Sequence, residues 1–232
     1  MKISPTLTEV KEIAKTGKYD ILPVSCEILS DFITPIEAMR ILQNVSTHCY
    51  LLESAQANEA WGRYTFLGYD PKLEINCIDG HMKLGKLSVE TENPSEYIRQ
   101  ILSEYKSPKF DYLPSFTGGL VGYFSYDYLG YKEKSIRGKA RDTEDFKDVD
   151  LMLFDKVIAF DNLCQKIILI ANMSLDAPET GYNKAIVELK QLRELLMHGE
   201  KKQNMGGKLL GEVTPLFEKE QYCDMVEKAK HH

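Results

Sequence analysis

A short stretch between two apolar segments carries side chains suited to binding a small polar molecule. From Tyr50 to Pro71 the sequence is YLLESAQANEAWGRYTFLGYDP, and both its ends have strand character. The first apolar segment ends in Glu53 and Ser54, which offer a carboxylate to an ammonium and a hydroxyl to a polar group. The second begins with Arg63, Tyr64 and Thr65. Apolar strands between such groups can enclose an aromatic ring, which suits an amino acid.

The same stretch also has a purely structural explanation. Leu51 and Leu52 then belong to the core, Glu53 and Ser54 begin a turn, and Arg63 is exposed. The residue pattern alone favours this explanation somewhat, because most polar side chains next to strands are solvated surface. Both interpretations therefore stay open on the residue types and spacing.

Other catalytic or metal-binding patterns are missing from the sequence. The five histidines form no metal-ligand spacing with each other or with cysteine, and there is no P-loop or nucleophile elbow. Gly118-Gly119-Leu120-Val121-Gly122 has glycines, but a strand continues after it through Tyr126 and Tyr128 where a dinucleotide site requires a helix. We expect these glycines to serve sheet packing.

Composition excludes several classes of protein. The formal net charge of −6 gives no basic surface for nucleic acid, and no apolar run approaches the roughly 18 residues of a membrane span. The five cysteines are an odd number without CxxC spacing, which predicts reduced thiols in a cytoplasmic protein. At 232 residues the chain is long enough to bury a sizeable core.

Periodicity predicts an α+β fold of antiparallel β-sheets flanked by helices. Four helices are expected near residues 6–15, 34–46, 94–106 and 179–199, the first two with capping boxes at Thr6/Glu9 and Thr34/Glu37. Alternation from 49 to 89 predicts one antiparallel meander, and the apolar run 151–173 predicts two strands joined at Asp161-Asn162.

The C-terminal part is predicted to be separate from the rest. Residues 198–211 are rich in Lys and Gly and resemble a linker, so we predict one domain over 1–211 and the start of another over 212–232. Thr214-Pro215 is expected to cap a last helix, which has an apolar face with nothing after it to cover that face. This helix suggests a chain that continues in a longer protein, with the final two histidines either native or vector-derived.

Several motifs together resemble one known family, component I of anthranilate synthase. They are YLLES followed by WGRYTFLGYDP, then PSFTGGLVGYFSYDYL, and finally FEKEQYCDMVEKAKHH, which is similar to the first helix of the family's catalytic half. LPVSCEILSDFITPIEAM is similar to the family's N-terminal segment, so the resemblance covers the chain. Related 4-amino-4-deoxychorismate synthases share the architecture with a looser LLES-like segment.

The resemblance implies a regulatory part of a larger enzyme. In the family, LLES belongs to the site where L-tryptophan inhibits, so the resemblance assigns Ser54 and Glu53 to this site, Leu52 to its wall, and Arg63, Tyr64 and Thr65 to its border. It implies that the complete enzyme uses Mg²⁺, chorismate and ammonia from a glutamine amidotransferase subunit, with catalytic and metal residues outside this chain. The 232 residues alone are then expected to be inactive. The alternatives are component I of 4-amino-4-deoxychorismate synthase and a stand-alone aromatic amino-acid-binding module.

Overall fold

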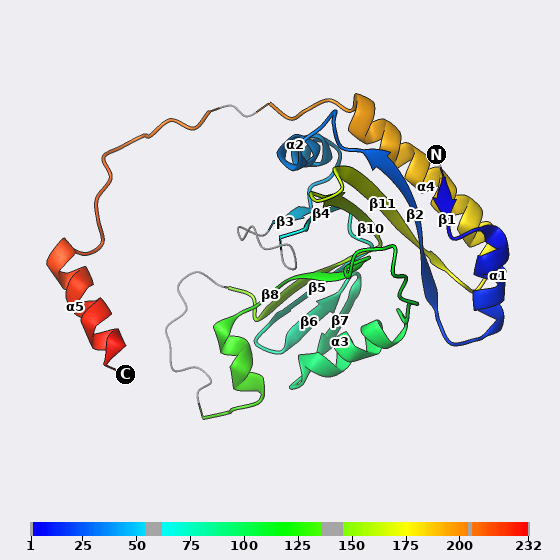
Figure 1. Ribbon diagram of the computed structural model, residues 1–232. Coiled ribbons are helices and arrows are strands. Elements are labelled where there is room, and N and C mark those ends of the chain that lie inside the picture. The colour runs from blue at the N-terminus through cyan, green and yellow to red at the C-terminus, as the bar shows by residue number, and fades with distance from the viewer. Residues whose placement is uncertain (1, 54–61, 136–145, 204–205, 232) are drawn as a thin grey trace. The chain divides into compact units, whose positions relative to one another are not determined.

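The computed structural model describes residues 2–53, 62–135, 146–203 and 206–231. The chain divides into two compact units, Met1–Lys202 and Gln203–His232. Within the described residues, the first unit contains a larger sheet of six strands and a smaller sheet of five, each with helices on one face (Figure 1). The predicted α+β class, with antiparallel sheets flanked by helices, is confirmed.

The larger sheet is built around a long pair of strands from the two ends of the unit. Its order is β1 (Ile3–Ser4), β2 (Ile21–Leu29), β11 (Lys166–Ser174), β10 (Lys156–Asp161), β4 (Tyr64–Tyr69) and β3 (Cys49–Leu52). β2 and β11 pair along nine residues, from Lys166 opposite Leu29 to Ser174 opposite Ile21. Both strands are nearly continuous apolar runs because both of their faces are covered.

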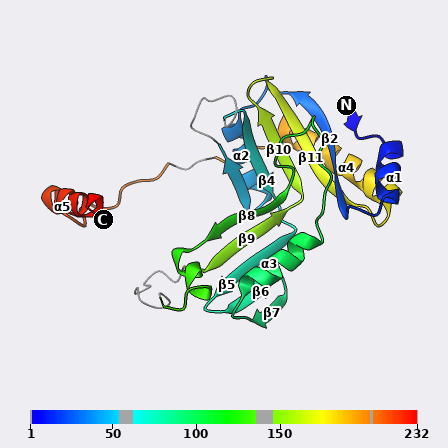
Figure 2. The same ribbon diagram turned by 60° about the horizontal axis from the view of Figure 1, so that its bottom comes forward.

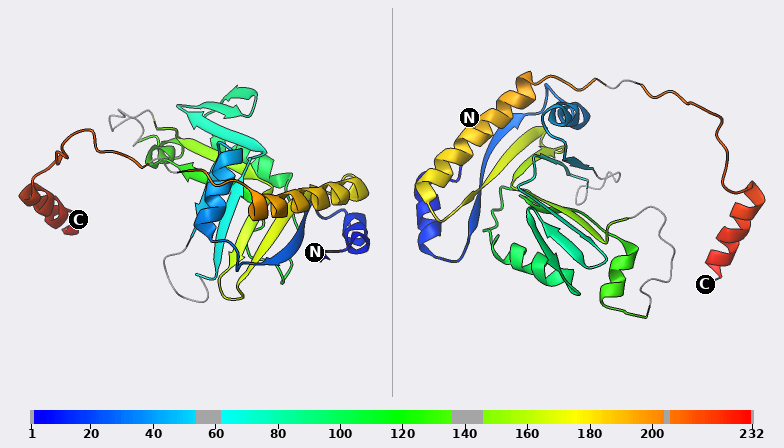
Figure 3. Two further views of the ribbon diagram at one scale, coloured as in Figure 1. Left: turned by 90° about the horizontal axis from the view of Figure 1, so that it is seen from above. Right: turned by 180° about the vertical axis from the view of Figure 1, so that it is seen from behind.

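Three helices cover one face of the larger sheet (Figures 1 and 3). They are α1 (Leu7–Lys15), α2 (Pro35–Val45) and α4 (Pro178–His198). Thr6 with Glu9 and Thr34 with Glu37 form the predicted capping boxes, which satisfy backbone N–H groups at the starts of α1 and α2. Every third or fourth side chain of α4 is buried against β2 and β11, as its periodicity predicts: Tyr182, Ala185, Leu189, Leu192 and Leu196.

The smaller sheet has its own core. Its order is β7 (Leu87–Glu90), β6 (His81–Leu84), β5 (Leu73–Ile78), β9 (Val149–Phe154) and β8 (Gly119–Phe124). Helix α3 (Pro94–Ser103) and the 3₁₀ helix η1 (Tyr126–Tyr131) cover one face of it (Figure 2). The buried residues there include Ile75, Cys77 and Met82 from the strands and Ile98 from α3.

The chain crosses from one sheet to the other at two short corners. Asp155 alone separates β9 in the smaller sheet from β10 in the larger one, and residues 70–72 separate β4 from β5. The alternation from 49 to 89 was predicted to form a single meander. That prediction is wrong, because β3 and β4 belong to the larger sheet and β5, β6 and β7 to the smaller one.

Three further predictions of element type or position are corrected. The apolar run 151–173 lies in three strands, β9, β10 and β11, since the chain changes sheet at Asp155. Tyr126 and Tyr128 lie in η1 and not in a strand, because the Ser125 hydroxyl accepts a bond from the Tyr128 N–H and caps a helical turn. The last helix, α5 (Lys219–Lys230), is capped by Glu218 with Gln221 and not by Thr214-Pro215.

The second unit contains α5, which carries Tyr222, Met225 and Val226 on its surface. The first unit ends at Lys202, inside the segment 198–211 that was predicted to be a linker. Among the described residues, no helix is long and apolar enough to cross a lipid bilayer. All five cysteines are free thiols.

Candidate functional site

The predicted ligand-binding stretch lies at the edge of the larger sheet, where β3 and β4 run antiparallel. Leu52 is opposite Phe66, Leu51 is opposite Leu67, and Tyr50 is opposite Gly68. Residues directly opposite each other share a face of a sheet, and neighbours along a strand alternate between faces. Leu51 therefore faces the helices with Leu67, as its packing in the helix-covered core shows. Leu52 lies on the other face.

The face that carries Leu52 is lined with aromatic rings. The Tyr64 and Phe66 ring centroids are 5.8 Å apart, and Phe116 meets Phe66 edge to face at 5.6 Å. Leu52 itself is 48% exposed at the border of this surface. Such rings offer flat apolar area and preferred stacking geometries to another aromatic group. Two of the predicted residues, Leu52 and Tyr64, are thus brought to one apolar face.

Tyr50 anchors β3 beside these rings. Its ring is edge to face with Phe154 at 4.7 Å between centroids and is only 8% exposed. A Cβ at Gly68 would lie 2.2 Å from a carbon of the Tyr50 ring, so the opposite position has to be glycine for the ring to lie there. Burial raises the pKa of the Tyr50 phenol well above its ordinary range. The ring is therefore a fixed apolar element of this edge.

Arg63 is held by a buried carboxylate at the end of β10. Its Nε donates to Asp161 Oδ1 at 3.1 Å and its Nη2 to Asp161 Oδ2 at 2.7 Å, a two-point contact. The Asp161 side chain has no exposed surface, whereas that of Arg63 is 36% exposed. The N–H groups of Leu163 and Cys164 also donate to Asp161 Oδ1. The Arg63 guanidinium carbon lies 4.9 Å from the centroid of the Tyr64 ring.

The ionised state of this pair is strongly favoured. Burial disfavours the Asp161 carboxylate, but the hydrogen bonds from Arg63 and the Cys164 N–H outweigh burial, so the pKa of Asp161 lies below its ordinary value. The hydrogen bond to Asp161 correspondingly raises the pKa of Arg63. The guanidinium therefore serves to fix the start of β4 against the end of β10.

Thr65 faces the opposite side of the sheet from Tyr64 and is 1% exposed. Its hydroxyl accepts a bond from the Asn162 side-chain amide at 3.3 Å, and the Asn162 N–H donates to the Arg63 carbonyl. The residues around Thr65 thus join β4 to the β10–β11 turn. The structure does not bring the Thr65 side chain onto the face of Leu52 and Tyr64.

The remaining two predicted residues, Glu53 and Ser54, follow β3 in the sequence. Glu53 is exposed and follows the strand directly. Ser54 lies outside the described residues, so its assignment stays a prediction.

Asp161 and Asn162 are the residues of this region that the sequence did not single out. They were interpreted as a turn dipeptide, and their turn position is correct. The available signal was the segment VIAFD, in which a carboxylate ends an almost wholly apolar strand. A charge buried at such a position requires a cationic partner. No pattern in the sequence indicated that Arg63, about a hundred positions earlier, supplies that partner.

Gly122 in β8 and Gly118, which directly precedes β8, have a structural explanation. Gly122 has φ of +153°, and a Cβ there would lie 1.9 Å from the Asp150 carbonyl oxygen on the neighbouring strand. Gly118 has φ of +144°, where a Cβ would meet the Asn172 amide nitrogen at 2.6 Å. Both positions require glycine for close packing of β8, which agrees with the sheet-packing role expected from the sequence.

In the described parts of the chain, no three His, Cys, Asp or Glu side chains are placed to hold a metal ion.

The sequence and the fold of this chain both have counterparts among known proteins. The sequence matches the chorismate binding enzyme family over residues 47–232. Since this match covers most of the chain, the protein belongs to the chorismate binding enzyme family.

Within that family, the chain is similar to proteins named anthranilate synthase component 1. It is 32% identical to the one from Acetivibrio thermocellus over 98% of this chain and 48% of the relative. It is 36% identical to the one from Pseudomonas aeruginosa over 81% of this chain and 39% of the relative. The chain thus spans about half the length of these curated relatives or less. The resemblance predicted from the motifs is confirmed.

The fold agrees with the sequence comparison. The crystal structure of anthranilate synthase component I from Streptococcus pneumoniae TIGR4 matches with a TM-score of 0.56 and 25% identity. The match covers 88% of this chain and 44% of that one.

Proposed function

We propose that this chain is the N-terminal part of an anthranilate synthase component I. In this proposal the complete protein adds ammonia to chorismate and eliminates pyruvate to give anthranilate, a step of tryptophan biosynthesis. The proposal is supported by the family match and by relatives that share the name over nearly the whole chain. Five free cysteines agree with a reducing, cytoplasmic location.

The proposed role of the described residues is to form half of a tryptophan feedback site. The observation that carries this role is the aromatic face at the sheet edge, where half-exposed Leu52 lies beside Tyr64 and Phe66. An indole packed there would bury apolar area, while Glu53 offers a carboxylate to the ligand ammonium and Ser54 a hydroxyl. The second half of the site would come from residues beyond this chain.

Arg63 and Thr65 have a supporting part in this proposal. The Arg63 guanidinium is bound at two points by Asp161, and the Thr65 hydroxyl is bound by Asn162 on the far face of the sheet. Both contacts fix β4 and hence the position of Tyr64. The ligand contacts are therefore assigned to Leu52, Glu53, Ser54 and Tyr64.

Catalysis is proposed to require the rest of the enzyme. The relatives are about twice as long as this chain, and the described residues offer no set of ligands for the Mg²⁺ expected of the complete enzyme. Ammonia would come from a glutamine amidotransferase subunit. The 232-residue chain incubated with chorismate, Mg²⁺ and ammonia should then give no anthranilate fluorescence, and fluorescence above that of a mock preparation would contradict this part of the proposal.

Inhibition of the full-length protein by L-tryptophan tests the regulatory site. Ser54→Ala should weaken inhibition by about 5- to 30-fold, equivalent to roughly 1–2 kcal/mol for one hydrogen bond, and Ser54→Phe should weaken it further because the ring fills ligand space. Each curve is normalised to the uninhibited rate of the same variant. Ser88→Ala, on exposed strand β7, is the matched control and should keep the original curve.

Unaltered inhibition in a Ser54→Phe protein that melts like the original would remove Ser54 from the site. A product other than anthranilate, such as 4-amino-4-deoxychorismate, would instead show that the parent enzyme is the related synthase.

A further inference from the structure

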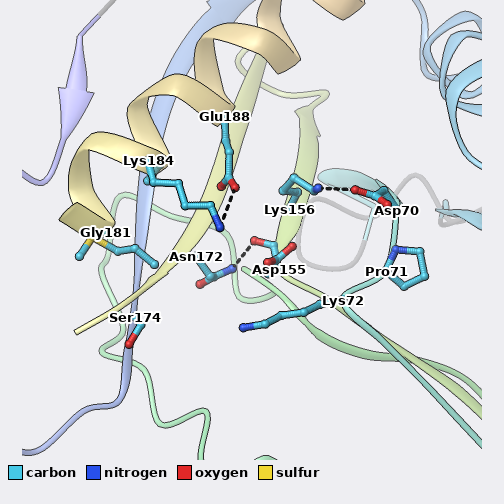
Figure 4. A pocket seen from close by; sticks show the side chains of 12 residues that line it. Asp70, Pro71, Lys72, Asp155, Lys156, Asn172, Ser174, Gly181, Lys184 and Glu188 are labelled. Atoms are coloured by element: carbon cyan, nitrogen blue, oxygen red, sulfur yellow. Dashed lines mark hydrogen bonds and ion pairs between the residues drawn. The ribbon is translucent and has the colours of Figure 1, made fainter. Parts of the chain in front are cut away.

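A groove with a charged lining lies between α4 and the two corners where the chain changes sheets. Its volume is about 510 Å³, within the range of small-molecule sites. One wall is a single face of α4, made by Gly181, Lys184, Ala185 and Glu188. The other wall comes from residues 70–72 and from Asp155 and Lys156 (Figure 4). We name it the corner groove.

Most charges in the corner groove are paired with each other. Lys156 Nζ lies 2.8 Å from Asp70 Oδ2, and Lys184 Nζ lies 3.7 Å from a Glu188 carboxylate oxygen. Two groups remain. Among the described residues, neither the Asp155 carboxylate nor the Lys72 ammonium has an ion-pair partner; Lys72 Nζ lies 5.3 Å from the centroid of the Tyr105 ring. Among the described residues, the groove thus offers one carboxylate and one ammonium that form no ion pair.

A smaller apolar pit opens beside the groove. It has a volume of about 100 Å³ and shares Asp155 and Asn172 with the groove lining. Its other walls include Leu102, Leu153 and Phe154. Asn172 is fixed between the two spaces, because its side-chain amide donates to the Thr117 carbonyl at 2.6 Å and to the Asp155 carbonyl at 2.9 Å.

We propose that the corner groove and its pit bind a free α-amino acid with a short apolar side chain. The ligand ammonium binds Asp155, the ligand carboxylate binds Lys72, and the side chain enters the pit. Three carboxylates in the lining disfavour a simple anion, and three lysines disfavour a simple cation. The site shares no residue with the aromatic face of Leu52 and Tyr64, so it stands independently of the tryptophan proposal.

Calorimetric titration of the 232-residue chain tests the ligand chemistry. L-Valine should bind saturably, and glycine should bind at least tenfold more weakly, because each buried methylene contributes about fourfold in affinity. N-acetyl-L-valine lacks the ammonium and L-valinamide lacks the carboxylate, so each should bind at least tenfold more weakly than L-valine. Failure of L-valine to saturate at tens of millimolar would overturn the proposal.

Substitutions in the corner groove test whether L-valine binds there. Asp155→Asn and Lys72→Met should each weaken L-valine binding at least tenfold, with melting curves that stay close to the original. Asp127→Asn in η1 and Lys86→Met after β6 change charges outside the groove and should leave binding unchanged. L-Valine binding that survives both groove variants would overturn the assignment. Inorganic phosphate that binds as tightly as L-valine and is insensitive to Asp155→Asn would also overturn it, since the groove would then be an anion site.

Discussion

The two ends of β10 each have an aspartate, and the two aspartates have opposite surroundings. Asp161 at one end is fully buried and accepts hydrogen bonds from Arg63, Leu163 and Cys164. Asp155 at the other end is half-buried beside a groove, and the described residues give its carboxylate no ion-pair partner. A carboxylate whose acceptor sites are filled by protein donors stabilises the fold, and one whose sites are open can receive a ligand.

The largest expected loss of stability comes from substitution of Asp161, whose acceptor sites are filled by protein donors. Asp161→Asn should lower the free energy of unfolding by about 3 kcal/mol, because it replaces a carboxylate oxygen, at a site with no exposed surface, by an amide N–H that faces the Arg63 donors. Urea unfolding measures the change. Asp155→Asn is the matched control and should change the free energy of unfolding by less than about 0.5 kcal/mol. Equal losses for the two variants would show that the ends of β10 do not differ as described.

The pH dependence of stability should differ between the original protein and Asp161→Asn. The folded pKa of Asp161 is lowered, so its contribution is complete above the ordinary carboxyl pKa of about 3.9 and is lost as pH falls through the lower, folded pKa. The gap in unfolding free energy between the original protein and Asp161→Asn should therefore stay constant from about pH 7 to 5 and narrow below about pH 4. A gap that widens on acidification would contradict the ion pair.

A small loss of stability is expected from the ion pair between Asp70 and Lys156, which lies beside Asp155. Asp70→Asn removes the partner of Lys156, but the Asp70 side chain is 66% exposed, so the loss should stay below about 1 kcal/mol. Asp70 has φ of +51°, a conformation that asparagine tolerates well, so the substitution adds no backbone strain. Unfolding at low and high salt measures the pair, because screening should reduce the difference. A loss comparable to that of Asp161→Asn would contradict this ranking.

Local signals in the sequence predicted the helices well. The capping boxes at Thr6 and Thr34 place the starts of α1 and α2 within one residue, and the periodicity of α4 identifies its buried face. The prediction for α5 was wrong because Thr214-Pro215 resembles a helix start, while the glutamate at 218 is a less common cap. Caps and periodicity involve neighbours along the chain, so they are visible without tertiary structure.

Strand partners depend on distant residues and were predicted less well. One residue, Asp155, moves the chain from the smaller sheet to the larger one, and an apolar run on either side of it gives no sign of the change. The resemblance likewise placed Leu52, Tyr64 and Thr65 at one candidate site, although alternation along β4 puts Thr65 on the face opposite Tyr64. The partners Asp161 for Arg63 and Asn162 for Thr65 also arise from pairing of β4 with β10, which no local pattern indicates.

The pairing of β2 with β11 has a consequence for how the protein is made. β2 is an apolar strand near the start of the chain. Its early neighbour β1 pairs with only Ser25 and Cys26, and its long partner β11 ends at Ser174, so most of β2 has no strand to pair with during early synthesis. At about 5–20 residues per second, the roughly 145 residues between the partners take about 7–30 seconds to emerge from the ribosome. During that interval most of Ile21–Leu29 has no strand partner and exposes apolar side chains. Nascent chains of this protein should therefore depend on chaperone binding at this segment more than chains whose first strands pair fully with close neighbours.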